Sequence, residues 1–384
     1  MRVVLSAVGK FHTFELAREM ANRDVLAAIF TGYPRFKLRQ EREVQAQLRT
    51  FPWLYTPYMA LRGRNLLKGR LLKQWDWANC LSFDAYTAWR MPPCDVYVGL
   101  SSAALWSGRQ ARQRGARFVC DRGSAHIRVQ DRILREEHAL WDMPYLGVDP
   151  RFIEREEAEY AAADCITVPS GFAVQSFIDQ GVTPHKLRRL PYGVNLGSFA
   201  RNGQAATDRF DVLFVGSMSL QKGIPYLLQA YKLLRHPRKS LSFAGSFDPA
   251  FIDAMKHRGL WSDDIVLLGH LPWEALGRRM SQSHALVLPS VQEGFGMVLA
   301  QALACGCPVI GSQHTGAPDL IEDGKAGYIV PIRNPQAIAD RLQGLADDPA
   351  LQQRLSQEAL ATVRHIGGWR NYGDQALAIY RELL

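Results

Sequence analysis

One carboxylate, Glu293, stands in a setting that could hold a phosphorylated ligand. A hydrophobic strand is expected over residues 285–288, and a turn containing Gly294 and Gly296 leads from Glu293 into a helix rich in small residues. A carboxylate accepts hydrogen bonds from hydroxyl groups. The start of a helix offers unpaired N–H groups and the positive end of a dipole, which suit a phosphate. The segment therefore predicts a ligand site at the carboxyl end of this strand.

Lys222 is a second candidate for ligand binding. It lies in FVGSMSLQKG, residues 214–223, which is typical of a strand, a loop and the start of a helix. A lysine just beyond a glycine turn is well placed to contact a diphosphate. A lone lysine is more often a solvated surface residue, but its spacing, upstream of the segment around Glu293, favours a phosphate-binding role.

The run from His284 to Val330 resembles the donor-binding signature of retaining glycosyltransferases of family 4, which have the two-domain GT-B fold. Segments AAADCITVPSGF, LPYGVNLGSF and FVGSMSLQKGIPYLLQA also match family patterns. The resemblance covers about the last 230 residues, from Glu156 onward, and the first 150 residues in outline. The family motif is Glu, seven residues and Glu, whereas this chain has Glu293 and then Gln301.

In this family the first carboxylate of the motif lies beside the donor sugar and the second holds the ribose hydroxyls. An amide has one acceptor oxygen and donates through its NH2, so ribose contact at Gln301 is expected to be rearranged or weaker. Ser217 stands where the family usually has an Arg, while Lys222 matches the family's Lys. The resemblance implies a catalytic Glu293 and a donor site made of Gly9, Gly216, Ser217, Lys222, Gly245, Gly294, Phe295, Gly296, Met297, Val298 and Gln301.

Further catalytic candidates lie in the first half of the chain. The family often has a His just after a central strand, near the reacting carbon. Here that strand ends at Asp121, and the next His is His126. Either a turn returns His126 to the cleft, or Asp121 serves as a polar partner or base. Lys10 and His12 either face the acceptor side of the cleft or merely flank the start of a helix.

The elements that would position these residues alternate between strand and helix. Buried-type strands are expected over residues 2–7, 25–30, 96–99, 117–121, 165–168, 211–215, 241–244, 265–268, 285–288 and 308–310. Such alternation predicts an α/β fold with parallel sheets. The resemblance makes this a GT-B fold, with two Rossmann-like doubly wound domains facing a central cleft. We expect residues 1–195 to bind the acceptor, residues 196–368 to bind the nucleotide sugar, and the helix over 369–384 to pack back on the first domain.

Composition narrows the class of protein. The chain has 384 residues, of which 47% are hydrophobic, and no apolar run is long enough to span a bilayer, so we expect a cytoplasmic protein. The cysteines are scattered, and buried reduced thiols are the expectation. No Asp-x-Asp follows a strand and no His/Cys cluster has metal-ligand spacing. We therefore expect no metal and no cofactor apart from the nucleotide sugar.

Positive charge is concentrated in the first half, where residues 1–195 carry 28 Lys/Arg against 20 Asp/Glu. Within residues 36–78, nine Lys/Arg stand against three acids among several aromatic residues. The piece LRGRNLLKGRLLKQW is typical of a basic amphipathic helix, which could lie on an anionic membrane surface. It is equally consistent with a helix that packs its leucines on the domain. No nucleic-acid-binding module is found, so nucleic acid is not expected as a partner.

Together these features predict a hexosyltransferase-type enzyme. It would move a sugar, with retention of configuration, from a nucleoside-diphosphate sugar to a glycan, glycolipid or small-molecule acceptor, in cell-surface polysaccharide or glycolipid biosynthesis. It would work in the cytoplasm or at the inner face of the membrane. A sugar-nucleotide epimerase of the same fold, or a non-catalytic scaffold of that fold, is the alternative.

Overall fold

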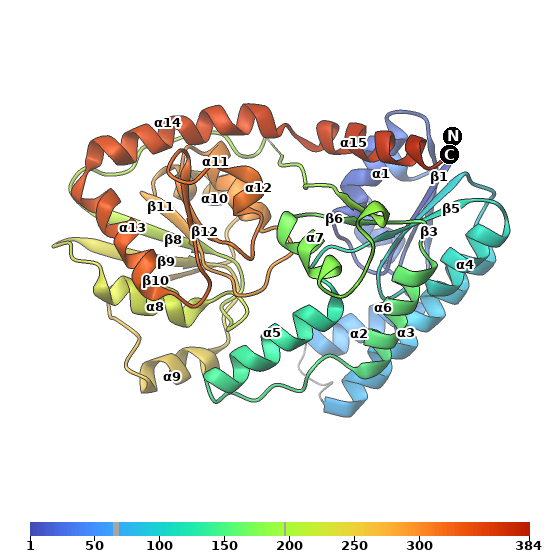
Figure 1. The fold of residues 1–384 in the computed structure, drawn as a ribbon, viewed down its shortest axis with the longest axis horizontal. Helices are drawn as coiled ribbons and strands as arrows, with labels where there is room; N and C mark the ends of the chain where they lie inside the picture. The colour runs from blue at the N-terminus through green and yellow to red at the C-terminus, as the bar shows by residue number, and fades with distance from the viewer. Residues whose placement is uncertain (64–68, 196) are drawn as a thin grey trace.

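The computed structural model describes residues 1–63, 69–195 and 197–384. Within these residues the chain forms two parallel sheets, one of seven strands and one of six, each accompanied by helices (Figure 1). The two sheets belong to successive halves of the chain. The predicted arrangement of two Rossmann-like domains is confirmed.

The first sheet is built from strands whose side chains alternate between two buried faces. In β1, Val3 and Leu5 join one hydrophobic cluster and Val4 joins another, as expected for a strand with helices on both sides. The strand order is β3 (Leu48–Thr50), β2 (Leu26–Thr31), β1 (Val3–Ala7), β4 (Val96–Leu100), β5 (Arg117–Asp121), β6 (Cys165–Val168) and β7 (Leu187–Arg189). The accompanying helices are α1 (Thr13–Ala21), α2 (Pro52–Gly63), α3 (Gly69–Arg90), α4 (Leu105–Gln113), α5 (Ile127–Leu140), α6 (Pro150–Ala162) and α7 (Gly171–Ile178).

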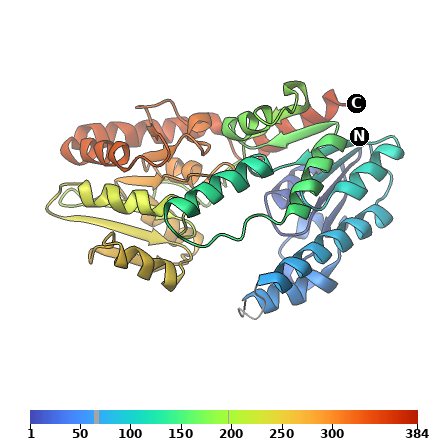
Figure 2. The same cartoon turned by 60° about the horizontal axis from the view of Figure 1, so that its bottom comes forward.

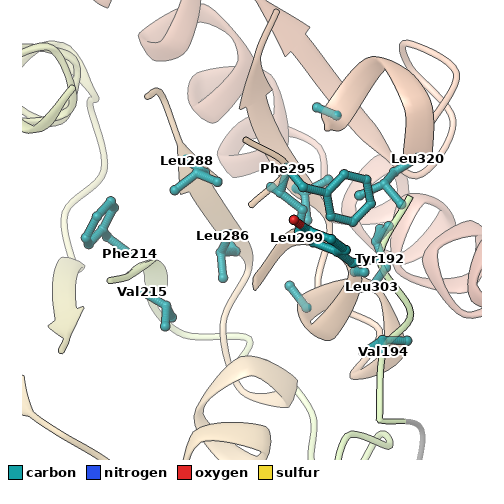
Figure 3. Packing of buried hydrophobic residues seen from close by; sticks show 14 of the residues in the cluster. Tyr192, Val194, Phe214, Val215, Leu286, Leu288, Phe295, Leu299, Leu303 and Leu320 are labelled. Atoms are coloured by element: carbon teal, nitrogen blue, oxygen red, sulfur yellow. The ribbon is translucent and has the colours of Figure 1, made fainter. Parts of the chain in front are cut away.

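The second sheet repeats this plan with an almost wholly buried centre. Its strand order is β10 (Ile265–Gly269), β9 (Lys239–Ala244), β8 (Phe210–Val215), β11 (Ala285–Leu288), β12 (Val309–Ser312) and β13 (Gly327–Val330). Its helices are α8 (Ile224–Leu233), α9 (Pro249–His257), α10 (Trp273–Ser281), α11 (Met297–Ala304), α12 (Ala317–Leu320), α13 (Pro335–Asp347) and α14 (Pro349–Ile366). Apolar side chains of β8, β11 and α11 belong to one buried hydrophobic cluster in its core (Figure 3).

The chain order reverses between β1 and β4 in the first sheet and between β8 and β11 in the second. In open parallel sheets, ligands bind beyond the carboxyl ends of the strands at such reversal points. The loops after these strands carry most of the predicted site residues. The fold therefore places the candidate site between the two domains.

The chain crosses between the domains at one place. Val194 and Gly368 form a parallel bridge there, and a Cβ on Gly193 would lie 2.6 Å from the backbone nitrogen of Trp369. After this crossing α15 (Trp369–Glu382) packs against α1 of the first domain, where Arg23 Nη2 lies 2.6 Å from Asp374 Oδ1. Both chain ends consequently lie on the first domain (Figure 1).

A second link between the domains is made by α5, which reaches across to the second domain (Figure 2). Arg333 Nε donates to Glu137 Oε2 at 2.7 Å, and Trp141 Nε1 donates to the Tyr226 hydroxyl at 3.1 Å. Glu137 is fully buried by this contact. The two domains are thus joined on either side of the space between them.

Candidate active site

Lys222 and Glu293 form an ion pair at the carboxyl ends of the strands of the second sheet. Glu293 Oε1 also accepts from the Gly294 amide at 3.2 Å, and both side chains are half-buried. The turn that carries Lys222 needs glycine at 223, where φ is +69° and a Cβ would lie 2.1 Å from the Pro289 carbonyl oxygen. The two segments singled out in the sequence are therefore packed together, and they bring a cation and a carboxylate to one point.

A glycine turn connects this pair to the start of α11. Gly296 precedes the helix with φ +80°, and Met297 and Val298 form its first, half-buried residues. The side chain of Phe295, 1% exposed, lies in the hydrophobic core with its ring edge-on to Tyr192 (Figure 3). Phe295 thus anchors the turn, and only its backbone is placed to serve a ligand.

Two further predicted glycines lie side by side at the ends of β8 and β9. Gly216 and Gly245 have φ values of +142° and +138°, and a Cβ on Gly245 would lie 2.2 Å from the Gly216 carbonyl oxygen. Ser217, in the next position, is exposed. This corner of the second sheet therefore stays free of side chains, as close approach of a ligand to backbone requires.

A cavity of 1310 Å³ lies between the domains. Its wall includes five of the predicted site residues, Gly9, Lys10, His12, Met297 and Gln301. Most of the remaining lining comes from the first domain, including Ser101, Ser102, Arg122, Gln130 and Glu156. Among the residues described, the Lys222–Glu293 pair stands outside this lining. The cavity is therefore mainly on the expected acceptor side.

Arg122 and Glu156 form a buried ion pair in the cavity wall, with Arg122 Nη1 3.1 Å from Glu156 Oε2. Burial alone would lower the pKa of Arg122, but the Glu156 carboxylate raises it. Ser102 also donates its hydroxyl to Glu156. Only the position of Arg122 just after β5 could have pointed to this network from the sequence.

The loop of the donor signature touches the first domain directly. A Cβ on Gly294 would lie 1.9 Å from the carbonyl oxygen of Gly123. Ser170 Oγ donates to the Gly294 carbonyl at 2.6 Å, and Gln292 Nε2 donates to Ser124 Oγ at 2.7 Å. The structure therefore holds the domains in contact at this point.

The expectation that His126 faces the cleft is wrong. His126 is 3% exposed and caps α5, where its Nδ1 accepts from the Arg128 amide at 3.3 Å. Its ring packs against Tyr160 and Phe177, with centroids 5.1 and 5.0 Å away. This burial lowers the pKa of His126 to about 4. A helix starts immediately after the turn, so the imidazole is used as a cap instead of reaching the cavity.

Asp121 and His12, by contrast, are brought together. His12 Nε2 lies 2.6 Å from Asp121 Oδ2, although the two residues are 109 positions apart. The sequence offered one indication of this contact: His12 follows β1 and Asp121 ends β5, two strands of the same parallel sheet whose carboxyl ends meet at one edge.

Part of the predicted basic helix lies outside the described residues, since residues 64–68 belong to that segment. Its described flanks are in α2 and α3, with Trp53 76% and Leu71 71% exposed. No helix among the described residues combines the length and apolar character needed to cross a membrane.

Within the same residues no three His, Cys, Asp or Glu side chains are grouped to hold a metal ion. All six cysteines are free thiols.

Two facing Rossmann-like domains with glycine turns at the strand ends define a GT-B-type architecture. A family model described as glycosyl transferases group 1 matches residues 198–362, and one described as a glycosyl transferase 4-like domain matches residues 10–193. The chain belongs to the family 4 type of glycosyltransferases.

Curated glycosyltransferases resemble parts of the chain. Alpha-D-kanosaminyltransferase of Streptomyces kanamyceticus is 32% identical over 180 residues, which cover 46% of each chain. A D-inositol 3-phosphate glycosyltransferase of Catenulispora acidiphila is 27% identical over 298 residues, 71% of this chain and 68% of the relative. The chain spans about half the length of most of the curated relatives that it matches.

Solved structures match over the whole chain. A sucrose-phosphate synthase from Thermosynechococcus elongatus has a TM-score of 0.74 at 21% identity, covering 100% of this chain and 99% of that one. Anabaena HepE in complex with UDP-glucose has a TM-score of 0.71 at 17% identity, with 100% of both chains covered. At these sequence identities, the structural similarity shows that the chain shares the fold of these proteins.

Proposed function

We propose that this chain is a retaining glycosyltransferase that moves a sugar from a nucleoside-diphosphate sugar to an acceptor hydroxyl of a glycan, glycolipid or small molecule. The observation that carries the proposal is the Lys222–Glu293 pair beside the start of α11. It offers a cation and a helix N-terminus for a diphosphate and a carboxylate for sugar hydroxyls. The name of the kanosaminyltransferase relative and the UDP-glucose bound to HepE agree with such a donor.

In this proposal the donor separates the ion pair. Lys222 turns to the diphosphate, the glycine corner at Gly216 and Gly245 receives it, and Glu293 is left to accept from sugar hydroxyls. Gln301, in the cavity wall, contacts the ribose with one accepting oxygen and one donating nitrogen. Electrostatic stabilisation of the departing diphosphate by Lys222 and the α11 N-terminus supplies much of the rate enhancement.

The acceptor binds on the side of the first domain, which supplies most of the cavity wall. The exposed Trp53 and Leu71, together with the exposed cation Arg70, would let α2 and α3 rest on an anionic membrane surface. An enzyme placed there meets glycolipid or surface-polysaccharide acceptors, which is the role we propose for it at the inner face of the membrane.

Calorimetric titration with UDP, GDP and ADP and their common sugar conjugates tests the donor site. We expect one nucleotide family to bind and Lys222→Ala to weaken that binding at least tenfold, since a charge-assisted contact to phosphate is lost. Lys325→Ala is the control, because Lys325 pairs with Glu322 on the surface at 2.6 Å. Equal affinity in wild type and Lys222→Ala would refute the phosphate assignment. Retention is tested by the anomeric configuration of the product in NMR spectra.

A further inference from the structure

A buried amide in the wall of the cavity has no partner within the protein. Asn79 lies on α3, is 2% exposed and lines the cavity between the domains. Its Oδ1 makes no hydrogen bond, and no other unpaired buried side-chain atom of the described residues belongs to the cavity wall. A buried amide oxygen without a partner destabilises a protein until some group donates to it. Asn79 is therefore a candidate contact for a ligand.

A hydroxyl group suits this carboxamide best. The carboxamide accepts through its oxygen and donates through its NH2, and a half-turn about χ2 exchanges the two. A hydroxyl can donate to the oxygen or accept from the NH2. A hydrocarbon chain would leave both groups without a partner, which is unfavourable in a buried setting.

The three Lys and Arg side chains of the same wall are already paired. Arg122 Nη1 lies 3.1 Å from Glu156 Oε2. Lys10 and Arg18 both form ion pairs with the buried carboxylate of Glu41. An anionic group on an acceptor would have to break one of these pairs. The wall therefore favours neutral polar groups over phosphate or carboxylate.

The loop after β4 offers a second hydrogen-bond acceptor. Ser102 lines the cavity with φ +80°, a conformation that is unfavourable for residues other than glycine. Glu159 Oε2 accepts from the Ser102 amide at 2.7 Å, and Arg155 Nε donates to the Ser102 carbonyl at 2.8 Å. The Ser102 hydroxyl donates to Glu156, so its oxygen keeps lone pairs that can accept from a ligand. Buried groups of α6 thus hold this strained residue at the cavity.

Apolar side chains stand in the same wall as these polar groups. Met59 of α2 and Phe152 of α6 line the cavity. Trp77, two residues before Asn79, meets the Phe152 ring edge-on with centroids 5.2 Å apart, which places α3 beside α6. A sugar ring has hydroxyls at its rim and C–H groups on its faces, so it can contact both kinds of surface.

Asn79 lies on a different element from the point of transfer. The donor signature touches the first domain at Gly123, whereas α3 packs against α2 and α4 of the first domain. A group that reaches Asn79 therefore belongs to a part of the acceptor other than the hydroxyl that receives the sugar.

Resting on the proposed function, we propose that Asn79 is a specificity-determining residue and that the acceptor is a glycan of at least two sugar rings. The ring that receives the sugar lies at the loop of Gly123, and a hydroxyl of the next ring pairs with the Asn79 carboxamide. Ser102 accepts from a further hydroxyl, and Met59 and Phe152 contact the faces of the rings.

The test compares acceptors of two lengths on the full chain. UDP-glucose, GDP-mannose and ADP-glucose serve as donors, and methyl glycosides of glucose, galactose and mannose and of their disaccharides serve as acceptors. In wild type, the best disaccharide should have a KM at least about fivefold below that of its monosaccharide, the effect of one hydrogen bond. In Asn79→Leu and Asn79→Ala this ratio of KM values should fall towards one.

Thr87→Val is the matched control. Thr87 is buried on α3, but its hydroxyl donates to the Phe83 carbonyl at 2.9 Å, and it is not a residue of the cavity wall. This variant should keep the wild-type ratio of KM values. Thermal unfolding adds a test without ligand. Asn79→Leu removes an unpaired buried amide and should melt at or above the wild-type temperature, whereas Thr87→Val loses a hydrogen bond and should melt lower.

The outcomes separate this inference from the proposed function. If wild type transfers sugar and both Asn79 variants keep its ratio of KM values, the inference is overturned and the transferase proposal stands. The same follows if no disaccharide accelerates nucleotide release, or if 1-octanol is a better acceptor than every sugar. Release of nucleotide from none of the donors would refute the proposed function, and the acceptor assignment with it. An Asn79→Leu variant that melts below Thr87→Val would show that the amide has a partner in the protein, which also overturns the inference.

Discussion

Gly294 and Gly123 touch across the cleft, backbone to backbone: a Cβ on Gly294 would lie 1.9 Å from the Gly123 carbonyl oxygen. One residue belongs to the donor signature and the other to the loop after β5 of the opposite domain. Only glycine permits such an approach without displacing one chain. The contact therefore fixes how closely the carboxylate of Glu293 can come to the first domain.

Gly294→Ala should separate the domains at this point. A displacement of about 1 Å between reacting groups can cost roughly 10²-fold in rate, so we expect turnover to fall by that order while nucleotide affinity changes little. Steady-state kinetics measures the fall in turnover, and small-angle scattering measures the separation of the domains. Gly344→Ala is the control, because a Cβ there meets nothing within 4 Å on helix α13. Wild-type turnover in Gly294→Ala would show that the contact is not needed.

Glu293→Ala should abolish transfer and leave the fold intact. The side chain is partly open to solvent and its ion pair with Lys222 is local, so its loss should change stability by about 1 kcal/mol or less. Activity and thermal unfolding, measured on the same preparation, test both statements. Glu322→Ala, which removes the acid of the exposed Lys325 pair, is the control. Near-wild-type turnover in Glu293→Ala would contradict its assigned role.

Metal removal should not affect the reaction. Lys222 and the N-terminus of α11 provide positive charge for the departing diphosphate, which is the task that a divalent cation performs in other transferases. We expect equal nucleotide release before and after dialysis against EDTA, with Mg²⁺ added back as the comparison. A loss of activity that Mg²⁺ restores would show that a cation is required.

Stability should fall between pH 6.5 and pH 4. Burial lowers the pKa of His126 to about 4 from an unfolded value of 6.5, so the unfolded chain binds more protons in this window. The contribution is complete above pH 6.5 and is lost as pH falls towards 4, up to about 3 kcal/mol. Burial lowers the pKa of His284 and His314 as well. Urea unfolding at pH 7 and pH 4.5 should show a smaller loss in His126→Asn than in wild type; an equal loss would count against this explanation.

Membrane contact should depend on Trp53 of α2 and the cation Arg70 of α3. We expect sedimentation with vesicles that contain phosphatidylserine at low salt, weakened in Trp53→Ser and in Arg70→Glu, because one removes buried apolar area and the other an electrostatic attraction. Trp89→Ser is the control, since Trp89 is similarly exposed at the far end of α3. If wild type stays in the supernatant, the membrane proposal fails.

Local pattern predicts the strands well. β5, β6 and β11 have the predicted bounds, and other central strands differ by one or two residues, because buried strands have continuous apolar runs. The edge strands β3, β7 and β13 were not predicted, since segments of three or four residues, such as Leu187–Arg189, carry no long apolar run. They form because a neighbouring strand offers unpaired backbone groups, which is a property of the fold.

The two donor segments could likewise be predicted from the sequence, because Lys222 and Glu293 each lie in a local strand-turn-helix pattern. The contact between His12 and Asp121 could not be predicted from the sequence, because the two residues are 109 positions apart. His126 was misplaced for the same reason: its burial depends on Tyr160 and Phe177, which lie on other elements. Sequence spacing predicts which loop a residue occupies, whereas the direction of its side chain depends on distant neighbours.

The position of α15 has a consequence for synthesis on the ribosome. Its partner α1 is synthesised before the second domain, and the whole second sheet must be synthesised before α15 emerges. The first domain can therefore complete its packing only after the second has been made. A nascent chain arrested before residue 369 would expose the apolar surface that Tyr372, Ala376 and Tyr380 cover, and it would be a target for chaperones.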